Sequence, residues 1–249
     1  MTESGGLTTR FRRDGALGSV IIPVARRLAR HYFRVRVFGA DQIPADRPVI
    51  YVAKHPQSFF YLETVILGLV TFWDNDKPAI RVLEKTNTSI HRTPLLGWYR
   101  RQVNAVPAAE EYALDALAHG ESLLIYPGGA RELYGLPDEL LWQGRTGFAR
   151  LAIRAGVAVL PFAIIGADQQ HLRRASVFGA SVWLPPFPLP VPLDYRFGSP
   201  IAPPPEGDAA AFAARVESAT RDLLQAGCAA RRRTWGASRE PAPLEQRPG

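Results

Sequence analysis

Short apolar runs alternate with amphipathic stretches between residues 35 and 165, and this alternation constrains the fold more than any other feature of the sequence. The apolar runs are residues 49–53, 123–126 and 157–165, and residues 79–83 form a further predicted strand. Their length is typical of buried strands. The stretches 110–119 and 146–155 have helical length, and each is followed by a glycine that can end a helix. The pattern predicts an α/β fold, with a mostly parallel mixed sheet flanked by helices.

The length of 249 residues suits one such domain, which we predict at residues 35–228. A basic segment, residues 1–34, precedes it, and residues 229–249 are predicted to form a disordered tail. Within the domain we expect a late edge strand at residues 194–197 and an amphipathic closing helix that ends at Gly227.

Positive charge is concentrated in the basic segment. The chain has a net charge of +7, and eight arginines but one acidic residue lie between residues 10 and 36. An amphipathic helix is predicted there, with arginines opposite an apolar sector of Leu17, Ile21, Val24, Leu28 and Tyr32. Such a helix can lie on an anionic membrane or pack on the domain. Nucleic acid is a weaker expectation, because no basic and aromatic binding motif accompanies the charge.

Several kinds of chemistry lack their sequence motifs. Cys228 is the only cysteine, and no histidine cluster has metal-ligand spacing, so no metal site is expected. The serine nucleophile elbow, the dinucleotide-binding glycine motif and the phosphate-binding loop are absent as well. The opening residues do not have the order of a secretory signal, which favours a location on the cytoplasmic side.

Polar residues directly follow two of the predicted strands. His55 comes after the strand at residues 49–53, and Gly128, Gly129, Arg131 and Glu132 come after the strand at residues 123–126. Open α/β sheets bind ligands at the carboxyl ends of their strands. A neutral imidazole can take a proton from a hydroxyl, and a guanidinium can hold a phosphate or carboxylate. The alternatives are a loop histidine without a role, an ordinary glycine turn and a surface ion pair.

In their order, these motifs resemble the glycerolipid and lysophospholipid acyltransferase superfamily, and most of all its diacylglycerol acyltransferase-like branch. The matching blocks are residues 49–58, 94–107, 126–132 and 159–163. The third block, Pro-Gly-Gly-Ala-Arg-Glu, has the form of that branch. The resemblance covers roughly residues 35–225 and implies a glycerol-3-phosphate acyltransferase-like fold.

The resemblance implies that His55 is the general base of acyl transfer. Most of the superfamily has an aspartate five residues after this histidine, where the present chain has Phe60. The acidic partner of His55 is therefore open, with Glu132 as the first choice and Glu63 as the second. Substrate-binding roles are implied for the neighbours of these residues and for the second block: Lys54, Ser58, Gly97, Arg100, Gly128, Gly129 and Arg131.

The implied reaction uses acyl-CoA as co-substrate and a lipid hydroxyl as acceptor, without a metal ion or other cofactor. Together with the basic helix, it predicts peripheral association with the cytoplasmic face of a membrane. The missing aspartate motivates an alternative, a catalytically degenerate protein that binds acyl-CoA or lipid on the same scaffold.

Overall fold

A computed structural model describes residues 23–56, 62–68, 78–84, 105–133, 136, 138–170, 173–177, 180–184 and 188–235. Its described strands form one large sheet in the order β1-β9-β6-β2-β5-β3-β4. The strands are β1 (Arg36–Phe38), β2 (Ile50–Val52), β3 (Ile80–Glu84), β4 (Ala105–Pro107), β5 (Ser122–Ile125), β6 (Val159–Ile165) and β9 (Asp194–Phe197). All neighbours are parallel except β6 and β9. The predicted mostly parallel mixed sheet is confirmed.

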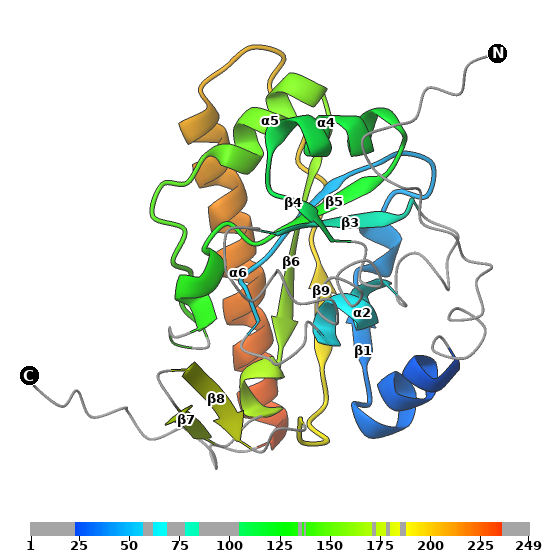
Figure 1. Ribbon diagram of the computed structural model, residues 1–249, viewed down its shortest axis with the longest axis vertical. Helices are drawn as coiled ribbons and strands as arrows, with labels where there is room; N and C mark the ends of the chain where they lie inside the picture. The colour runs from blue at the N-terminus through cyan, green and yellow to red at the C-terminus, as the bar shows by residue number, and fades with distance from the viewer. Residues whose placement is uncertain are drawn as a thin grey trace, which may run out of the picture.

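Helices cover both faces of this sheet. Helices α4 (Glu110–Ala118), α5 (Gly147–Ala155) and α6 (Ala209–Trp235) lie to one side, and α2 (Leu62–Gly68) lies to the other (Figure 1). Successive strand residues point to opposite faces, so β2 contributes to both layers. Ile50 and Val52 pack with α4, α5 and α6, whereas Tyr51 packs with α2. The all-apolar β2 is thus buried on both faces, as parallel strands are.

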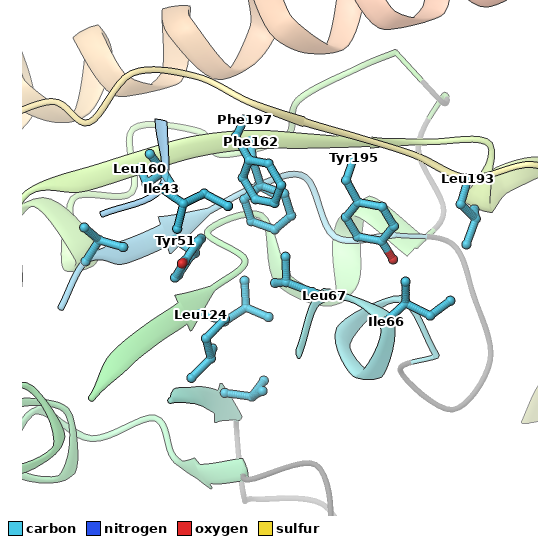
Figure 2. Close-up of a cluster of buried hydrophobic side chains, with 14 of the residues drawn as sticks. Ile43, Tyr51, Ile66, Leu67, Leu124, Leu160, Phe162, Leu193, Tyr195 and Phe197 are labelled. Carbon is cyan, nitrogen blue, oxygen red and sulfur yellow. The ribbon is translucent and has the colours of Figure 1, made fainter. Parts of the chain in front are cut away.

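Aromatic rings fill the α2 face of the sheet. Phe162 and Phe197 stack at 5.6 Å, and Tyr51 meets both rings edge-on at 6.2 and 6.4 Å. Figure 2 shows these rings on one side of the cluster and Ile66 and Leu67 of α2 below Tyr195 and Leu193. Each such side chain contributes about 1.5–3 kcal/mol by leaving water, so the short helix α2 is fixed by packing.

The site lies where the central strands end. In the register of the sheet, Val52 of β2 is opposite Ile125 of β5 and Pro161 of β6. Because β2 and β5 are parallel neighbours, His55 and Gly128, each three residues beyond the paired positions, emerge side by side. The fold therefore brings the two polar stretches together at the carboxyl ends of the central strands.

Two expectations for the second half of the chain are wrong, and one element was not anticipated. Strand β9 lies between β1 and β6 and is not an edge, because β1 pairs with its outer side. A separate hairpin, β7 (Arg173–Val177) and β8 (Ala180–Leu184), was not anticipated. Helix α6 does not end at Gly227 but continues to Trp235, so it passes the predicted domain boundary and takes in the first residues of the expected tail.

Gly227 is a packing position. A Cβ atom there would lie 2.6 Å from Cγ1 of Ile165 in β6 and 3.0 Å from Cδ of Arg196 in β9. The absence of a side chain lets α6 approach the sheet closely. The helix continues past Gly227 because this packing compensates for the poor helix propensity of glycine.

Part of the predicted N-terminal helix is described. Residues 23–27 are helical and lead into a π-helical turn, η1 (Leu28–Tyr32). Val24, Leu28 and Tyr32 of the predicted apolar sector are 54%, 44% and 39% exposed, whereas Leu17 and Ile21 lie outside the described residues. None of the helices in the described ranges has the length and apolar character needed to cross a bilayer.

Candidate active site

The hydrogen bonds of His55 fix both its main chain and its ring. Its backbone N–H donates to Oε2 of Glu132 at 2.7 Å, and its ring Nδ1 lies 2.9 Å from the carbonyl oxygen of Pro56. A carbonyl oxygen only accepts, so Nδ1 carries the proton in this arrangement. The lone pair is then on Nε2, which is the tautomer that a general base requires.

The surroundings of the imidazole keep it neutral. Burial lowers the pKa of His55; the bond to the Pro56 carbonyl opposes this shift, and the positive charge of Lys54 adds to it. The ring lies 4.7 Å from the ring of Tyr126, whose hydroxyl is 3.2 Å from Oγ1 of Thr64 in α2. Packing on Tyr126 limits the rotation of the imidazole and excludes water from one of its faces.

Glu132 links two loops through its carboxylate. The side chain is fully buried, at 0% exposure. Oε2 accepts the N–H of His55 at 2.7 Å, and Oε1 accepts the N–H of Leu141 at 3.0 Å. Each bond joins a charged acceptor to a main-chain donor, the strong class of hydrogen bond. Glu132 thus anchors the loop that carries His55 to the loop that precedes α5.

Gly128 makes room for this carboxylate. A Cβ atom on Gly128 would lie 2.1 Å from Cδ of Glu132, a distance that no side chain can adopt. Gly129 serves the backbone instead: its φ of +57° lies in the left-handed region, and its N–H closes the turn onto the carbonyl of Tyr126 at 3.0 Å. The two glycines therefore shape the turn that lets Glu132 reach the backbone of His55.

Lys54 lies inside the protein. It is 8% exposed, and its Nζ is 3.5 Å from the carbonyl oxygen of Glu132. Burial lowers the pKa of Lys54, and the carboxylates of Glu132 and Asp168 oppose that shift. Burial likewise raises the pKa of Glu132, against its two hydrogen bonds and the charges of Lys54 and Arg145. These contacts favour an internal, structural role for the ammonium group.

A cavity of about 1230 Å³ opens in front of these residues. His55, Tyr126 and the glycine turn line one part of it, and apolar residues of β3, α4 and α5, such as Val82, Ala113 and Leu151, line another. Single ligand pockets commonly measure roughly 300–1,000 Å³. The cavity therefore has room for a large ligand or for two substrates, with His55 at its wall.

The structure brings five of the predicted site residues together. His55, Gly128, Gly129 and Arg131 line the cavity, and Glu132 supports them from below. Glu63 is fully buried in α2, where its carbonyl accepts the hydroxyl of Tyr195 at 2.9 Å. The predicted substrate-binding residues Ser58, Gly97 and Arg100, and Phe60 in the position of the aspartate, lie outside the described residues.

Other site residues were not identified from the sequence. Pro56 and Leu141 act through main-chain groups, which side-chain motifs do not reveal. Arg145 donates to the carbonyl of Pro127 at 3.0 Å and lines the cavity together with Arg150. The buried Trp142 packs on Phe148 at 5.5 Å and holds this loop in the core. A tryptophan in an otherwise polar stretch was the sequence feature that could have pointed to this loop.

No group of three or more His, Cys, Asp and Glu side chains within the described ranges could hold a metal ion. What the residues around His55 provide is a neutral nitrogen base, main-chain N–H groups at a glycine turn, and guanidinium groups. Proton transfer and stabilisation of an oxyanion are within the reach of such a set.

Curated relatives resemble a large part of the chain. An uncharacterized protein of Mycobacterium tuberculosis is 27% identical over 213 residues, which are 77% of this chain and 59% of that protein. A human 2-acylglycerol O-acyltransferase 3 is 26% identical, over 63% of this chain and 48% of that one. A chloroplastic phytyl ester synthase 2 of Arabidopsis thaliana is 26% identical, over 53% of this chain and 20% of the enzyme. The chain thus spans under two thirds of these relatives.

A solved structure shares the fold. The crystal structure of the 1-acyl-sn-glycerophosphate acyltransferase PlsC from Thermotoga maritima matches with a TM-score of 0.57 and 22% identity, over 83% of this chain and 79% of that one. A family model described as Acyltransferase matches residues 34–165, which include β1 to β6, His55 and the glycine turn. By this match, the chain belongs to the acyltransferase family.

Proposed function

We propose that the protein is an enzyme that transfers a fatty acyl group from acyl-CoA to a hydroxyl group of a glycerolipid or lysophospholipid. The observation that carries the proposal is the state of His55: a half-buried, neutral imidazole with its proton on Nδ1, at the wall of a large cavity. The names of similar proteins support the lipid acceptor, since they include the human 2-acylglycerol O-acyltransferase 3 and a 1-acyl-sn-glycerol-3-phosphate acyltransferase of Chlamydomonas reinhardtii.

In the proposed reaction, Nε2 of His55 takes the proton of the acceptor hydroxyl as its oxygen attacks the thioester carbon. A tetrahedral intermediate forms, with negative charge on the former carbonyl oxygen. Its collapse breaks the carbon–sulfur bond, and the departing thiolate takes the proton back from the imidazolium. The steps need only proton transfer and charge stabilisation, so we propose that the enzyme uses no metal ion or redox cofactor.

The oxyanion needs a fixed donor near the histidine. We assign this role to the backbone N–H of Gly128, because the N–H of Gly129 already closes the turn onto Tyr126. Losing one donor of this kind typically costs about 3–4 kcal/mol of transition-state stabilisation. Glu132 holds Gly128 and His55 in a constant relation, since its side chain lies over the glycine and binds the histidine N–H.

The proposal revises the part given to Glu132. Its observed hydrogen bonds run to main-chain N–H groups, while the ring nitrogen Nδ1 faces the carbonyl of Pro56. We therefore propose that Pro56 orients the imidazole and that Glu132 is a positioning residue. The main-chain carbonyl of Glu63 accepts the Tyr195 hydroxyl at 2.9 Å, and we propose that Glu63 helps to hold α2 on the sheet.

We further propose that the enzyme associates peripherally with the cytoplasmic face of a membrane. Val24, Leu28 and Tyr32 are exposed on the N-terminal helix at spacings of four residues, with Arg26, Arg27 and Arg30 among them. Anionic lipids attract such basic helices, and their apolar side chains can enter the interface. Both the acyl acceptor and the product belong to that interface.

Lipid mass spectrometry of the purified protein tests the function. The protein is incubated with acyl-CoA and a panel of lysophosphatidate, monoacylglycerol, diacylglycerol and a long-chain alcohol. We expect one acylated acceptor to appear together with free coenzyme A in equal amounts. Tight binding of acyl-CoA without an acylated product would overturn the enzyme and favour a lipid-binding protein.

A further inference from the structure

Three charged side chains lie near the active site but do not line the cavity. They are Lys54, which directly precedes His55, Asp168 in the short helix η6 (Ala167–Gln170), and Arg231 near the end of α6. Lys54 and Arg231 are buried, and Asp168 is half-buried. Charged groups seldom lie inside a protein unless they are paired. Their positions therefore call for a role that does not involve direct contact with a ligand in the cavity.

Arg231 joins the last turns of α6 to the segment that follows β6. Its Nη1 donates to the carbonyl of Pro192 at 2.8 Å, and its Nε donates to Oε1 of Gln169 in η6 at 3.0 Å. Gly166 permits this approach, because a Cβ atom there would lie 2.7 Å from Nη1 of Arg231. Figure 1 shows these turns of α6 beside the end of β6. Neutral oxygens thus fix the guanidinium against η6, and its charge is balanced by carboxylates.

Two carboxylates act on this guanidinium, those of Asp194 and Asp168. Arg36 already binds both carboxylate oxygens of Asp194, each at 2.7 Å. Asp168 lies in η6, the helix that Arg231 binds. Burial raises the pKa of Asp168, whereas main-chain hydrogen bonds and the charges of Arg231 and Lys54 oppose this shift. Asp168 therefore stands between two cations, one on α6 and one beside His55.

Lys54 extends the set of charges to the active site. Its Nζ lies 3.5 Å from the carbonyl oxygen of Glu132, and the carboxylate of Glu132 accepts the backbone N–H of His55. Burial lowers the pKa of Lys54, and the charges of Glu132 and Asp168 oppose this shift. One ammonium group thus interacts with a carboxylate on the glycine turn and with a carboxylate on η6.

We propose that Arg231 and Asp168 are positioning residues of the active site, which hold Lys54 charged and in place beside the catalytic loop. Along the set, from Arg231 to Glu132, positive and negative charges alternate. Removing one charge leaves a neighbour uncompensated inside the protein, whereas removing an opposite pair does not. The inference rests on the proposed function, because it places these residues in the service of acyl transfer by His55.

The kinetics of acyl transfer separate positioning from substrate binding. Arg231→Met and Asp168→Asn should each lower kcat by about tenfold, because misplacing the base slows the chemical step. KM should stay unchanged, since neither residue lines the cavity. Arg231→Lys keeps the charge and should retain most of kcat. The double variant, Arg231→Met with Asp168→Asn, should lose less kcat than the product of the two single losses, because it removes an opposite pair.

The matched control is Arg233→Met. Arg233 is an exposed arginine two residues further along α6. Its replacement removes the same charge from the same helix without touching η6, so kcat and KM should equal those of the natural protein. Denaturant unfolding of every variant shows which of them are folded, and kcat is compared among the folded ones.

Histidine NMR of the full chain gives a readout that needs no turnover. The ring signals of His55 are assigned by their absence in His55→Gln. At neutral pH, Arg231→Met and Asp168→Asn should shift these signals, and Arg233→Met should not. In Lys54→Met the titration of His55 should move to higher pH, because the charge of Lys54 lowers the pKa of the imidazole.

Unshifted His55 signals in both Arg231→Met and Asp168→Asn would overturn the positioning role. So would a natural kcat in variants that are merely less stable, or single losses that simply multiply in the double variant. Should a single variant not fold, a folded double variant with natural His55 signals supports the pairing, and displaced signals overturn it. The proposed function fails separately: shifted signals in a protein that transfers no acyl group would keep the positioning and remove the enzyme.

Discussion

A main-chain carbonyl and a carboxylate divide the task of orienting His55. The carbonyl of Pro56 receives the ring proton at Nδ1, and Glu132 receives the backbone N–H. A carboxylate on the ring would stabilise the protonated imidazole and raise its pKa, whereas a neutral carbonyl does so less. In this chain burial dominates, and the pKa of His55 is lowered.

The pH profile should report this arrangement. The neutral imidazole is the active form, and its lowered pKa extends that form below the ordinary value of about 6.5. We expect kcat/KM to be independent of pH near neutrality and to fall as the pH drops through a value below about 6.5. Acyl transfer at fixed low acyl-CoA, followed across pH, measures it. An inflection clearly above the ordinary value would show that a carboxylate acts on the ring.

Gly128→Ala should disrupt the Glu132 link. The added Cβ would lie 2.1 Å from the Glu132 side chain, which must then give up its bonds to His55 and Leu141. We expect a loss of at least about 2 kcal/mol in the free energy of unfolding and a fall in kcat of about 100-fold from misplacement of the base.

The control for this variant is Gly147→Ala. Gly147 also lines the cavity, but a Cβ there would meet no atom within 4 Å. Its stability should be unchanged within about 0.5 kcal/mol. Equal stability of the two variants in denaturant unfolding would contradict the packing assigned to Gly128.

At the scale of elements, α6 binds the sheet through a glycine. Helix propensity alone would favour alanine at Gly227 by about 0.5–1 kcal/mol, whereas overlap with a packed side chain costs about 1–3 kcal/mol. The 2.6 Å approach to Ile165 makes the overlap the larger effect. We expect Gly227→Ala to lower the free energy of unfolding by about 1–2 kcal/mol.

A double-mutant cycle with Ile165→Ala checks this contact. Removing the Ile165 side chain leaves space for the new methyl group. The double variant should therefore lose less free energy of unfolding than the sum of the losses of the two single variants. Additive losses would mean that Gly227 does not limit the approach of α6 to β6.

The N-terminal helix carries a prediction about membranes. Val24→Glu and Leu28→Glu each place a negative charge on the apolar stripe, the exposed side chains of Val24, Leu28 and Tyr32. Losing the burial of one such side chain should weaken binding to anionic vesicles by about tenfold in each case. Leu136→Glu is the control, because Leu136 is 64% exposed but lies outside that helix. Sedimentation with vesicles measures the effect; equal binding of all three variants and the natural protein would contradict membrane docking through the stripe.

At the scale of the whole molecule, the sequence predicted the sheet and the pairing of its two polar stretches. Buried parallel strands are continuous apolar runs, so β2, β5 and β6 were visible. The place of β9 was not, because strand order depends on contacts between distant segments. Gly227 was taken for a helix end, since the pattern of one segment does not show the sheet packed against it.

The candidate site, too, could be predicted only in part. His55 and the glycine turn could be predicted because their residue types and positions after strands carry the information. The roles of Pro56 and Leu141 could not, because any residue supplies a backbone carbonyl or N–H. Arg145 and Arg150 line the same cavity as the glycine turn only once the loop before α5 folds against Pro127.

The most direct test of the account is the kcat/KM of His55→Gln for acyl transfer from acyl-CoA. Glutamine is polar and of similar size, but it cannot take the proton of the acceptor hydroxyl. We predict a fall by a factor of roughly 100–10,000, with coenzyme A binding and thermal unfolding close to those of the natural protein. A variant that keeps its fold and retains acyl transfer within about tenfold of the natural rate would contradict His55 as the base.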